Sequence, residues 1–210
     1  MKKILLILLV ALPLVAQPQE TASRRPVGTC GFVGSFDIGA FSDWGKNKEK
    51  LDGGEGYGGE FGAFYKWTWP SKWFLQTEAT FAIDQYRFNV PDQSEKARLT
   101  RYGISDRWEG GYTFAGNRLG IAPTVGVEFS TSLKDKIHNV SSERRKELED
   151  CWRQGNIALG FGVNLTRGNF GVSLMGYFGL LNLKENSAPD YLGKCYYGNK
   201  FIVSLKYTID

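Results

Sequence analysis

The chain has 210 residues, of which 26 are Lys or Arg and 22 are Asp or Glu, so its formal net charge is only +4. This near balance of basic and acidic residues excludes the strongly basic surface that is typical of a nucleic-acid-binding protein. Aromatic residues make up 14% of the chain, glycines number 26 and prolines only seven. This mixture favours many strands joined by tight turns over a helical protein, and the length is that of one domain.

The first residues have the pattern of a secretory signal peptide. Lys2 and Lys3 precede an apolar run that ends at Ala16, which predicts a signal peptide over 1–16. The run is well short of the ~20 residues that a spanning helix needs. We predict a short polar linker over 17–29 and one domain over 30–210. No segment after the leader is a long continuous apolar run, so any membrane spanning must use strands.

From Cys30 onward, apolar residues recur at every second position, the period of a strand with two different faces. Eight runs of this kind are predicted, over 30–40, 57–69, 73–86, 100–114, 118–130, 153–167, 170–182 and 200–210. Most are long enough to cross a hydrocarbon layer at a ~45° tilt, whereas strands of soluble proteins usually have about 5 or 6 residues. The connections alternate long and short, as in outer-membrane barrels with long extracellular loops and short periplasmic turns.

Charged residues within the runs fall almost entirely on one parity. On the apolar parity only Asp106 is charged, and we expect it either high in the membrane or at a β-bulge. The opposite parity carries six acids and five bases, which we predict to form a network of ion pairs in a shared lumen: Asp37, Glu60, Lys66, Glu78, Asp84, Arg101, Arg107, Glu109, Glu128, Lys200 and Lys206. Burying these charges in the core of a soluble barrel would cost much free energy, whereas in a narrow transmembrane barrel they can pair with each other and with water. The charged parity therefore faces the lumen and the apolar parity faces lipid.

Aromatic residues lie near the ends of the runs, where we expect the membrane interfaces. Tyr and Trp are enriched at such interfaces. The predicted periplasmic belt consists of Trp67, Trp69, Trp73, Tyr112, Phe114 and Tyr207, and the predicted outer belt of Tyr86, Tyr102, Phe129 and Tyr197. The sequence therefore predicts an all-β fold, a closed eight-stranded antiparallel up-and-down transmembrane β-barrel.

This organisation resembles the small eight-stranded bacterial outer-membrane barrels of the OmpA/OmpX-like group over residues 30–210. The resemblance implies a place in the bacterial outer membrane, contact with its lipids and lipopolysaccharide, and insertion by the barrel-assembly machinery. The last strand resembles the insertion signal of such proteins, but it ends in Ile209 and Asp210 where an aromatic residue is usual. Gln17, just after the predicted cleavage site, is similar to the precursors of Bacteroidetes barrels.

Three cysteines in an exported chain suggest one disulfide and one thiol left over. Cys151 and Cys195 each lie two residues before a run that starts at the extracellular rim, so we predict a disulfide between them. Cys30 lies on the periplasmic side and is expected to be a free thiol. One histidine and three separated cysteines cannot supply the usual metal ligand sets, and no glycine-rich phosphate loop is present. We therefore expect no metal, no cofactor and no catalytic residue.

The predicted function is that of a non-enzymatic outer-membrane barrel with a filled lumen, acting structurally or through its extracellular loops. An eight-stranded barrel has an interior that side chains just fill. The longest and most charged loop, over 131–152, is the expected site for an extracellular ligand. Two alternatives stay open: a lipid-modifying enzyme using His138 with Ser141 or Ser142, and a soluble lipocalin-like ligand-binding barrel.

Overall fold

The computed structural model describes residues 25–42, 54–90, 95–115, 119–149, 151–183 and 197–209. The predicted signal peptide over 1–16 and most of the predicted linker lie outside these residues. The first strand begins at Val27, so the last three residues of the predicted linker belong to the barrel. None of the helices in the described part of the chain is long and apolar enough to cross a membrane.

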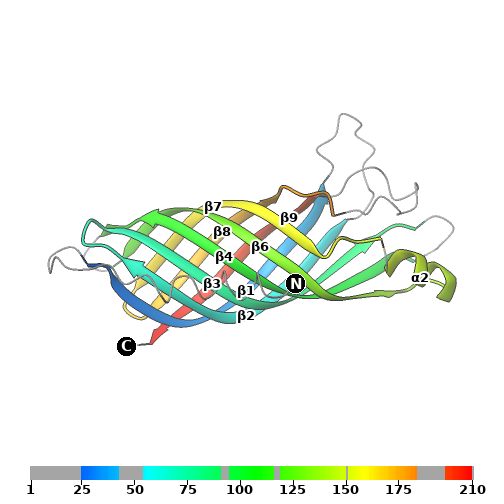
Figure 1. Cartoon of the computed structure of the whole chain (residues 1–210), viewed down its shortest axis with the longest axis horizontal. Helices are drawn as coiled ribbons and strands as arrows, with labels where there is room; N and C mark the ends of the chain where they lie inside the picture. The colour runs from blue at the N-terminus through cyan, green and yellow to red at the C-terminus, as the bar shows by residue number, and fades with distance from the viewer. Residues whose placement is uncertain are drawn as a thin grey trace, which may run out of the picture.

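The described residues form nine strands and one helix (Figure 1). The elements are β1 (Val27–Ser42), β2 (Glu55–Thr68), β3 (Trp73–Phe88), β4 (Ala97–Tyr112), β5 (Phe114–Ala115), β6 (Gly120–His138), α2 (Ser142–Glu149), β7 (Gly155–Arg167), β8 (Phe170–Gly179) and β9 (Tyr197–Ile209). The two-residue β5 follows β4 after a break at Thr113, and both pair with β6. They therefore count as one of the eight strands of the barrel.

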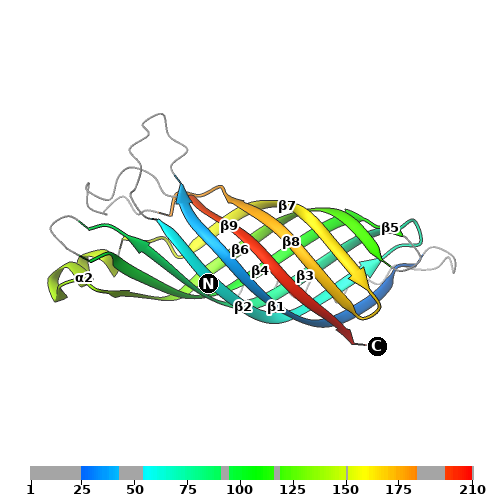
Figure 2. The same ribbon diagram turned by 180° about the vertical axis from the view of Figure 1, so that it is seen from behind.

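All strands pair antiparallel with their neighbours, and the sheet closes on itself. The order is β4-β3-β2-β1-β9-β8-β7-β6-β5, and the additional pairing of β4 with β6 completes the ring. The first and last strands are joined by a register that runs from Cys30 opposite Ile209 to Ser42 opposite Tyr197. The views from both sides show strands around the whole wall, strongly tilted to its long axis (Figure 2). The predicted closed eight-stranded barrel is therefore confirmed.

The strands have an apolar outer face and a polar inner face over most of their length. On β2 and β3 the burial alternates at almost every residue. Many large apolar side chains are exposed on the outside, including Phe32, Phe36, Phe61, Phe81, Val125, Phe161, Phe201 and Leu205. Exposed apolar bands around a charged interior are the arrangement of transmembrane barrels of bacterial outer membranes. It is the reverse of a soluble lipocalin-like barrel, and this alternative is not supported.

The two ends of the barrel differ. The end that holds the start of β1 and the end of β9 carries the short connections, including a turn in which the Lys72 N–H donates to the Trp69 carbonyl at 2.9 Å. Aromatic rings gather here: Trp73 lies 5.3 Å from Tyr112, and Phe170 lies 5.2 Å from Tyr207. This is the periplasmic end, because both chain ends and the short turns are periplasmic in such barrels. Helix α2 lies at the opposite, extracellular end (Figure 1).

The extracellular end differs from the prediction. The prediction of one long loop over 131–152 is wrong, because β6 continues to His138 and α2 occupies 142–149. The reason is a β-bulge: Tyr102 pairs with Lys134 but Gly103 pairs with Ser132, which leaves Leu133 as the extra residue. The bulge shifts the parity of β6, so the period of two that marks a strand is interrupted in the sequence.

Candidate functional site

The centre of the lumen is an ion-pair cluster around Arg107. Its guanidinium contacts carboxylates from three other strands, those of Glu60 on β2, Glu78 on β3 at 3.2 Å and Glu128 on β6 at 2.9 Å. All four side chains are almost completely buried, with at most 1% of each side chain exposed. The planar guanidinium offers five donors, so it alone can bind carboxylates on three sides.

A second cluster, closer to the periplasmic end, surrounds Lys206. Its ammonium group binds Glu78 and lies 3.3 Å from Glu109. Glu109 also accepts hydrogen bonds from the Tyr177 hydroxyl at 2.8 Å and from the Asn164 amide at 3.4 Å. Because Glu78 contacts both Arg107 and Lys206, the two clusters form one continuous network across the lumen.

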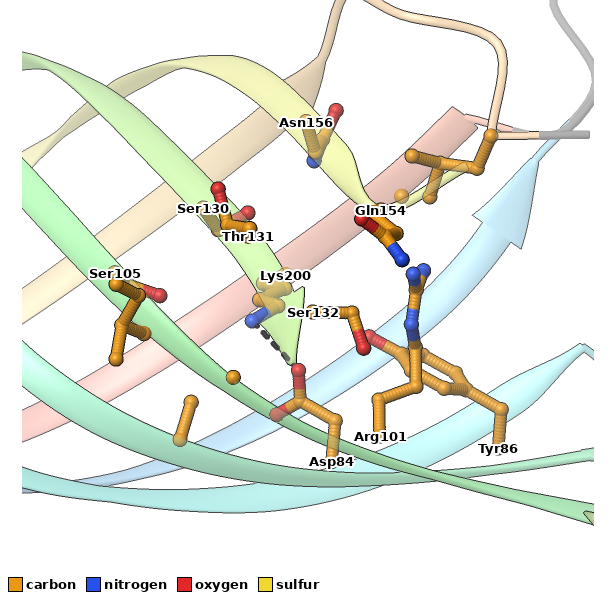
Figure 3. A pocket seen from close by; sticks show the side chains of 15 residues that line it. Asp84, Tyr86, Arg101, Ser105, Ser130, Thr131, Ser132, Gln154, Asn156 and Lys200 are labelled. Atoms are coloured by element: carbon orange, nitrogen blue, oxygen red, sulfur yellow. Dashed lines mark hydrogen bonds and ion pairs between the residues drawn. The ribbon is translucent and has the colours of Figure 1, made fainter. Parts of the chain in front are cut away.

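A third cluster, toward the extracellular end, surrounds Lys200 (Figure 3). Lys200 lies 2.9 Å from Asp84 and 3.7 Å from Glu60, which joins it to the Arg107 cluster. Asp37 and Asp84 lie on either side of Gly58 in the strand register. A Cβ atom on Gly58 would come within 2.5 Å of the Asp37 Oδ2 atom, so a glycine is required for the two carboxylates to approach. Asp37 is fully buried, and its carboxylate accepts no hydrogen bond from the described residues.

The two remaining predicted lumen residues lie at the ends of the network. Arg101 binds Asp135 at 3.2 Å and donates a hydrogen bond to the Arg153 carbonyl at 2.7 Å, so it ties β4 to the segment that follows α2. Lys66 lies at the periplasmic end with its ammonium 4.4 Å from the centre of the Phe74 ring. Sequence reasoning missed Asp135, because the bulge at Leu133 reverses the parity that identified the eleven predicted lumen residues.

One cavity in the upper lumen is small. A cavity of about 40 Å³ lies between Asp84, Arg101 and Lys200, with Ser105 and Asn156 among its polar neighbours (Figure 3). A water molecule needs roughly 10 to 15 Å³ of such space, so the cavity has room for a few waters and no larger solute. The polar side chains that line it are suited to hold those waters.

An apolar cluster, here called the cap, lies at the extracellular end of the barrel. Its members come from β3, β4 and β6, from α2 and from the segments after β3, α2 and β8: Tyr86, Phe88, Val90, Ala97, Leu99, Ile137, Leu148, Cys151, Trp152 and Leu183. The Phe88 and Trp152 rings meet edge to face at 5.8 Å. Tyr86 is therefore buried inside the end of the barrel and is not part of the predicted outer aromatic belt.

Helix α2 holds one side of the cap in place. The Ser141 hydroxyl accepts a hydrogen bond from the Arg144 N–H at 3.4 Å, as a helix N-cap does. Leu148 is fully buried and is the apolar residue of a helix that otherwise holds Ser142 and charged residues. Backbone hydrogen bonds from Ser132 to Gln154 and from Arg153 to Leu183, both at 2.7 Å, attach the segment after α2 to the barrel wall.

The other residues singled out in the sequence are also placed. Asp106 faces outward with no bulge beside it, and its carboxylate accepts hydrogen bonds from Thr77 at 3.2 Å and from the Trp108 indole at 3.1 Å. Cys30 is an exposed free thiol at the periplasmic end. Cys151 is buried in the cap, and Cys195 lies outside the described residues, so the disulfide between them stays a prediction.

Comparison with known proteins finds solved structures with a similar fold. No protein-family model and no curated protein matches the chain. Among solved structures, the outer-membrane enzyme PagL is 12% identical, with a TM-score of 0.47, over 84% of this chain and 99% of that one. The attachment invasion locus protein Ail of Yersinia pestis, solved with the heparin analogue sucrose octasulfate, is 12% identical, with a TM-score of 0.42, over 87% and 99%. Neisserial surface protein A is 10% identical, with a TM-score of 0.39, over 87% and 97%. At these identities the likeness extends to the fold alone.

The first prediction concerns the centre of the network. Replacing Arg107→Met should lower the free energy of unfolding by about 3 to 5 kcal/mol, because three buried carboxylates lose their shared cation. Urea titration of the refolded protein in detergent, followed by tryptophan fluorescence, measures the change. Lys66→Met is the matched control: its ammonium contacts an aromatic ring, and no ion pair binds it in the described residues, so the loss should be about 1 kcal/mol or less. Equal losses for the two variants would contradict the central role of Arg107.

The second prediction concerns the cap. Leu148→Ala should open α2 locally, because removing a fully buried leucine costs about 2 to 5 kcal/mol. Trypsin should then cleave faster at Arg144, Arg145 and Lys146, while the barrel still migrates as a folded, heat-modifiable band. The adjacent Glu149→Ala variant removes an exposed side chain of the same helix and should be cleaved at the wild-type rate. The role of the cap is refuted if both variants are cleaved equally fast.

Proposed function

We propose that this outer-membrane barrel is not a pore and not an enzyme, and that it acts structurally or through contacts made by its extracellular end. The observation that carries the proposal is the ion-pair network around Arg107, which crosses the centre of the lumen with almost completely buried side chains. A solute would have to break several buried ion pairs to pass. The cap packs further buried apolar side chains at the extracellular end.

The shape of the extracellular end supports a role in surface contacts. The part of the chain predicted to bind a ligand, residues 131–152, is largely a folded unit built on β6, α2 and the cap. A folded unit loses less conformational entropy on binding than an irregular loop. Insertion by the barrel-assembly machinery stays a prediction from the resemblance.

The test of a closed lumen is solute entry into proteoliposomes. We expect vesicles that contain the refolded chain to swell in arabinose no faster than empty vesicles, while vesicles with a general porin swell rapidly. The fraction of folded protein is checked by heat modifiability in the same samples. Swelling at a rate close to that of the porin would overturn the proposal.

The lipid-modifying alternative depends on His138, the only histidine of the chain. His138 is the last residue of β6 and pairs with Arg98. In the described part of the chain it forms no side-chain hydrogen bond with Ser141 or Ser142, and the Ser141 hydroxyl caps α2. A serine nucleophile needs its base within hydrogen-bond reach, although this contact is often looser without substrate. The geometry therefore supports the non-enzymatic proposal.

This part of the proposal is tested by the lipid A of expressing cells. Cells that make the wild-type chain, cells that make His138→Ala and cells with an empty vector are compared by mass spectrometry. We expect the same lipid A species in all three. A modified species that appears with the wild-type chain and disappears with His138→Ala would show that the barrel is an enzyme.

A further inference from the structure

The outward-facing side chains change character at the extracellular end of β3, β4 and β6. Below Tyr102 they are almost all apolar, whereas above it they are mainly basic. These residues, here called the basic face, are Arg87, Arg98, Lys134, Lys136 and His138. Their outward direction follows from their neighbours, because Phe88, Leu99 and Ile137 are buried inside the cap.

The register brings the bases of this face together. Arg87 lies directly opposite Arg98, and Arg98 lies directly opposite His138. Like charges at directly opposite positions destabilise a sheet unless a counter-charge lies between them. No carboxylate lies within ion-pair distance of any of the five bases in the described residues. The acidic side chains nearest in the register and the chain are Glu55, opposite Arg87, and Glu95, just before β4.

The height of the basic face matches the layer of lipid headgroups. Tyr102 is a half-buried aromatic residue of the kind that lies at the interface, and the Lys136 ammonium lies 5.6 Å from the centre of its ring. Lys134 is the register partner of Tyr102. Two residues along a strand with a ~45° tilt climb roughly 5 Å, and the headgroup layer is roughly 5 to 8 Å thick on each side. Lys134 and Lys136 therefore project sideways into this layer.

An apolar groove on the barrel wall leads to the same level. It has a volume of about 800 Å³, and it is lined by Phe36, Ile38, Phe178 and Phe201. Glu55 and Arg87 also line the groove. A groove of this kind on a lipid-facing wall fits an acyl chain, and Arg87 connects it to the cationic surface beside it.

We propose that the basic face binds the phosphate groups of an outer-leaflet glycolipid of the lipid A type, with one acyl chain in the groove. The inference deepens the proposed surface role, because it names the partner of the extracellular end. Arginine binds phosphate oxygens with two parallel hydrogen bonds, and lysine binds them as a point charge. A phosphate between Arg87 and Arg98 would neutralise the pair of like charges that the sheet places there.

The test is binding of purified bisphosphorylated lipid A to the refolded full chain in zwitterionic detergent, measured by native mass spectrometry. The wild-type chain should bind it more tightly than dephosphorylated lipid A, and added salt should weaken the binding. The triple variant Arg87→Gln, Arg98→Gln, Lys136→Gln should lose at least about tenfold in affinity, given the usual contribution of each base near an anionic lipid surface. Heat modifiability confirms that the variant is folded.

The matched control removes three exposed bases at the periplasmic end, Arg25→Gln, Lys72→Gln and Arg167→Gln, and should bind like the wild-type chain. Equal affinity of the wild-type chain and the first triple variant, or no preference for phosphate, overturns the inference. So does a variant that keeps lipid A binding but loses binding of soluble heparin, which would assign the basic face to a sulfated polysaccharide. None of these substitutions changes the lumen. The outcome of the swelling assay, which tests the proposed function, is therefore independent of the outcome of the lipid A binding assay.

Discussion

The buried ion pairs of Arg107 are the interaction on which the interior of this barrel depends. One guanidinium, on β4, binds carboxylates from β2, β3 and β6, so it holds four strands together. Such a cluster is tolerated because each carboxylate contacts the shared cation, and this attraction offsets the cost of removing the charges from water. Glu78 and Glu60 extend it to Lys206 and Lys200, and the result is a lumen filled by side chains along most of its length.

The wall of the barrel reverses its polarity at the outer surface of the membrane. Within the membrane the outside is apolar and the inside is charged, as lipid outside and a narrow polar lumen require. Above Tyr102 the outside is basic, while Leu99 and Ile137 on the inside are completely apolar. The same strands thus extend beyond the hydrocarbon layer, where an inward apolar face must be covered. Helix α2 and Trp152 provide that cover.

Much of the fold could be predicted from the sequence, because a strand between lipid and a polar lumen has the strongest alternation that a strand can show. The eight strands, and the inward direction of residues such as Glu128, follow from this alternation. The extracellular end could not be predicted in the same way. The extra residue at Leu133 reverses the parity of β6, so 134–138 no longer match the pattern of 118–130. Tyr86 was misplaced for a related reason, since an aromatic residue on the inner parity belongs to the cap and not to the belt.

The reversal of polarity fits the proposed role of the extracellular end. Buried ion pairs cross the lumen, so in this proposal the interior serves stability. The cap in turn fixes the position of β3, β4 and β6 above the membrane, and with them the direction of every base on their outer side. A cationic surface on paired strands needs less ordering when it meets an anion than one on an irregular loop. The internal packing at the extracellular end therefore supports the inferred lipid contact, because it holds the strands that carry the bases.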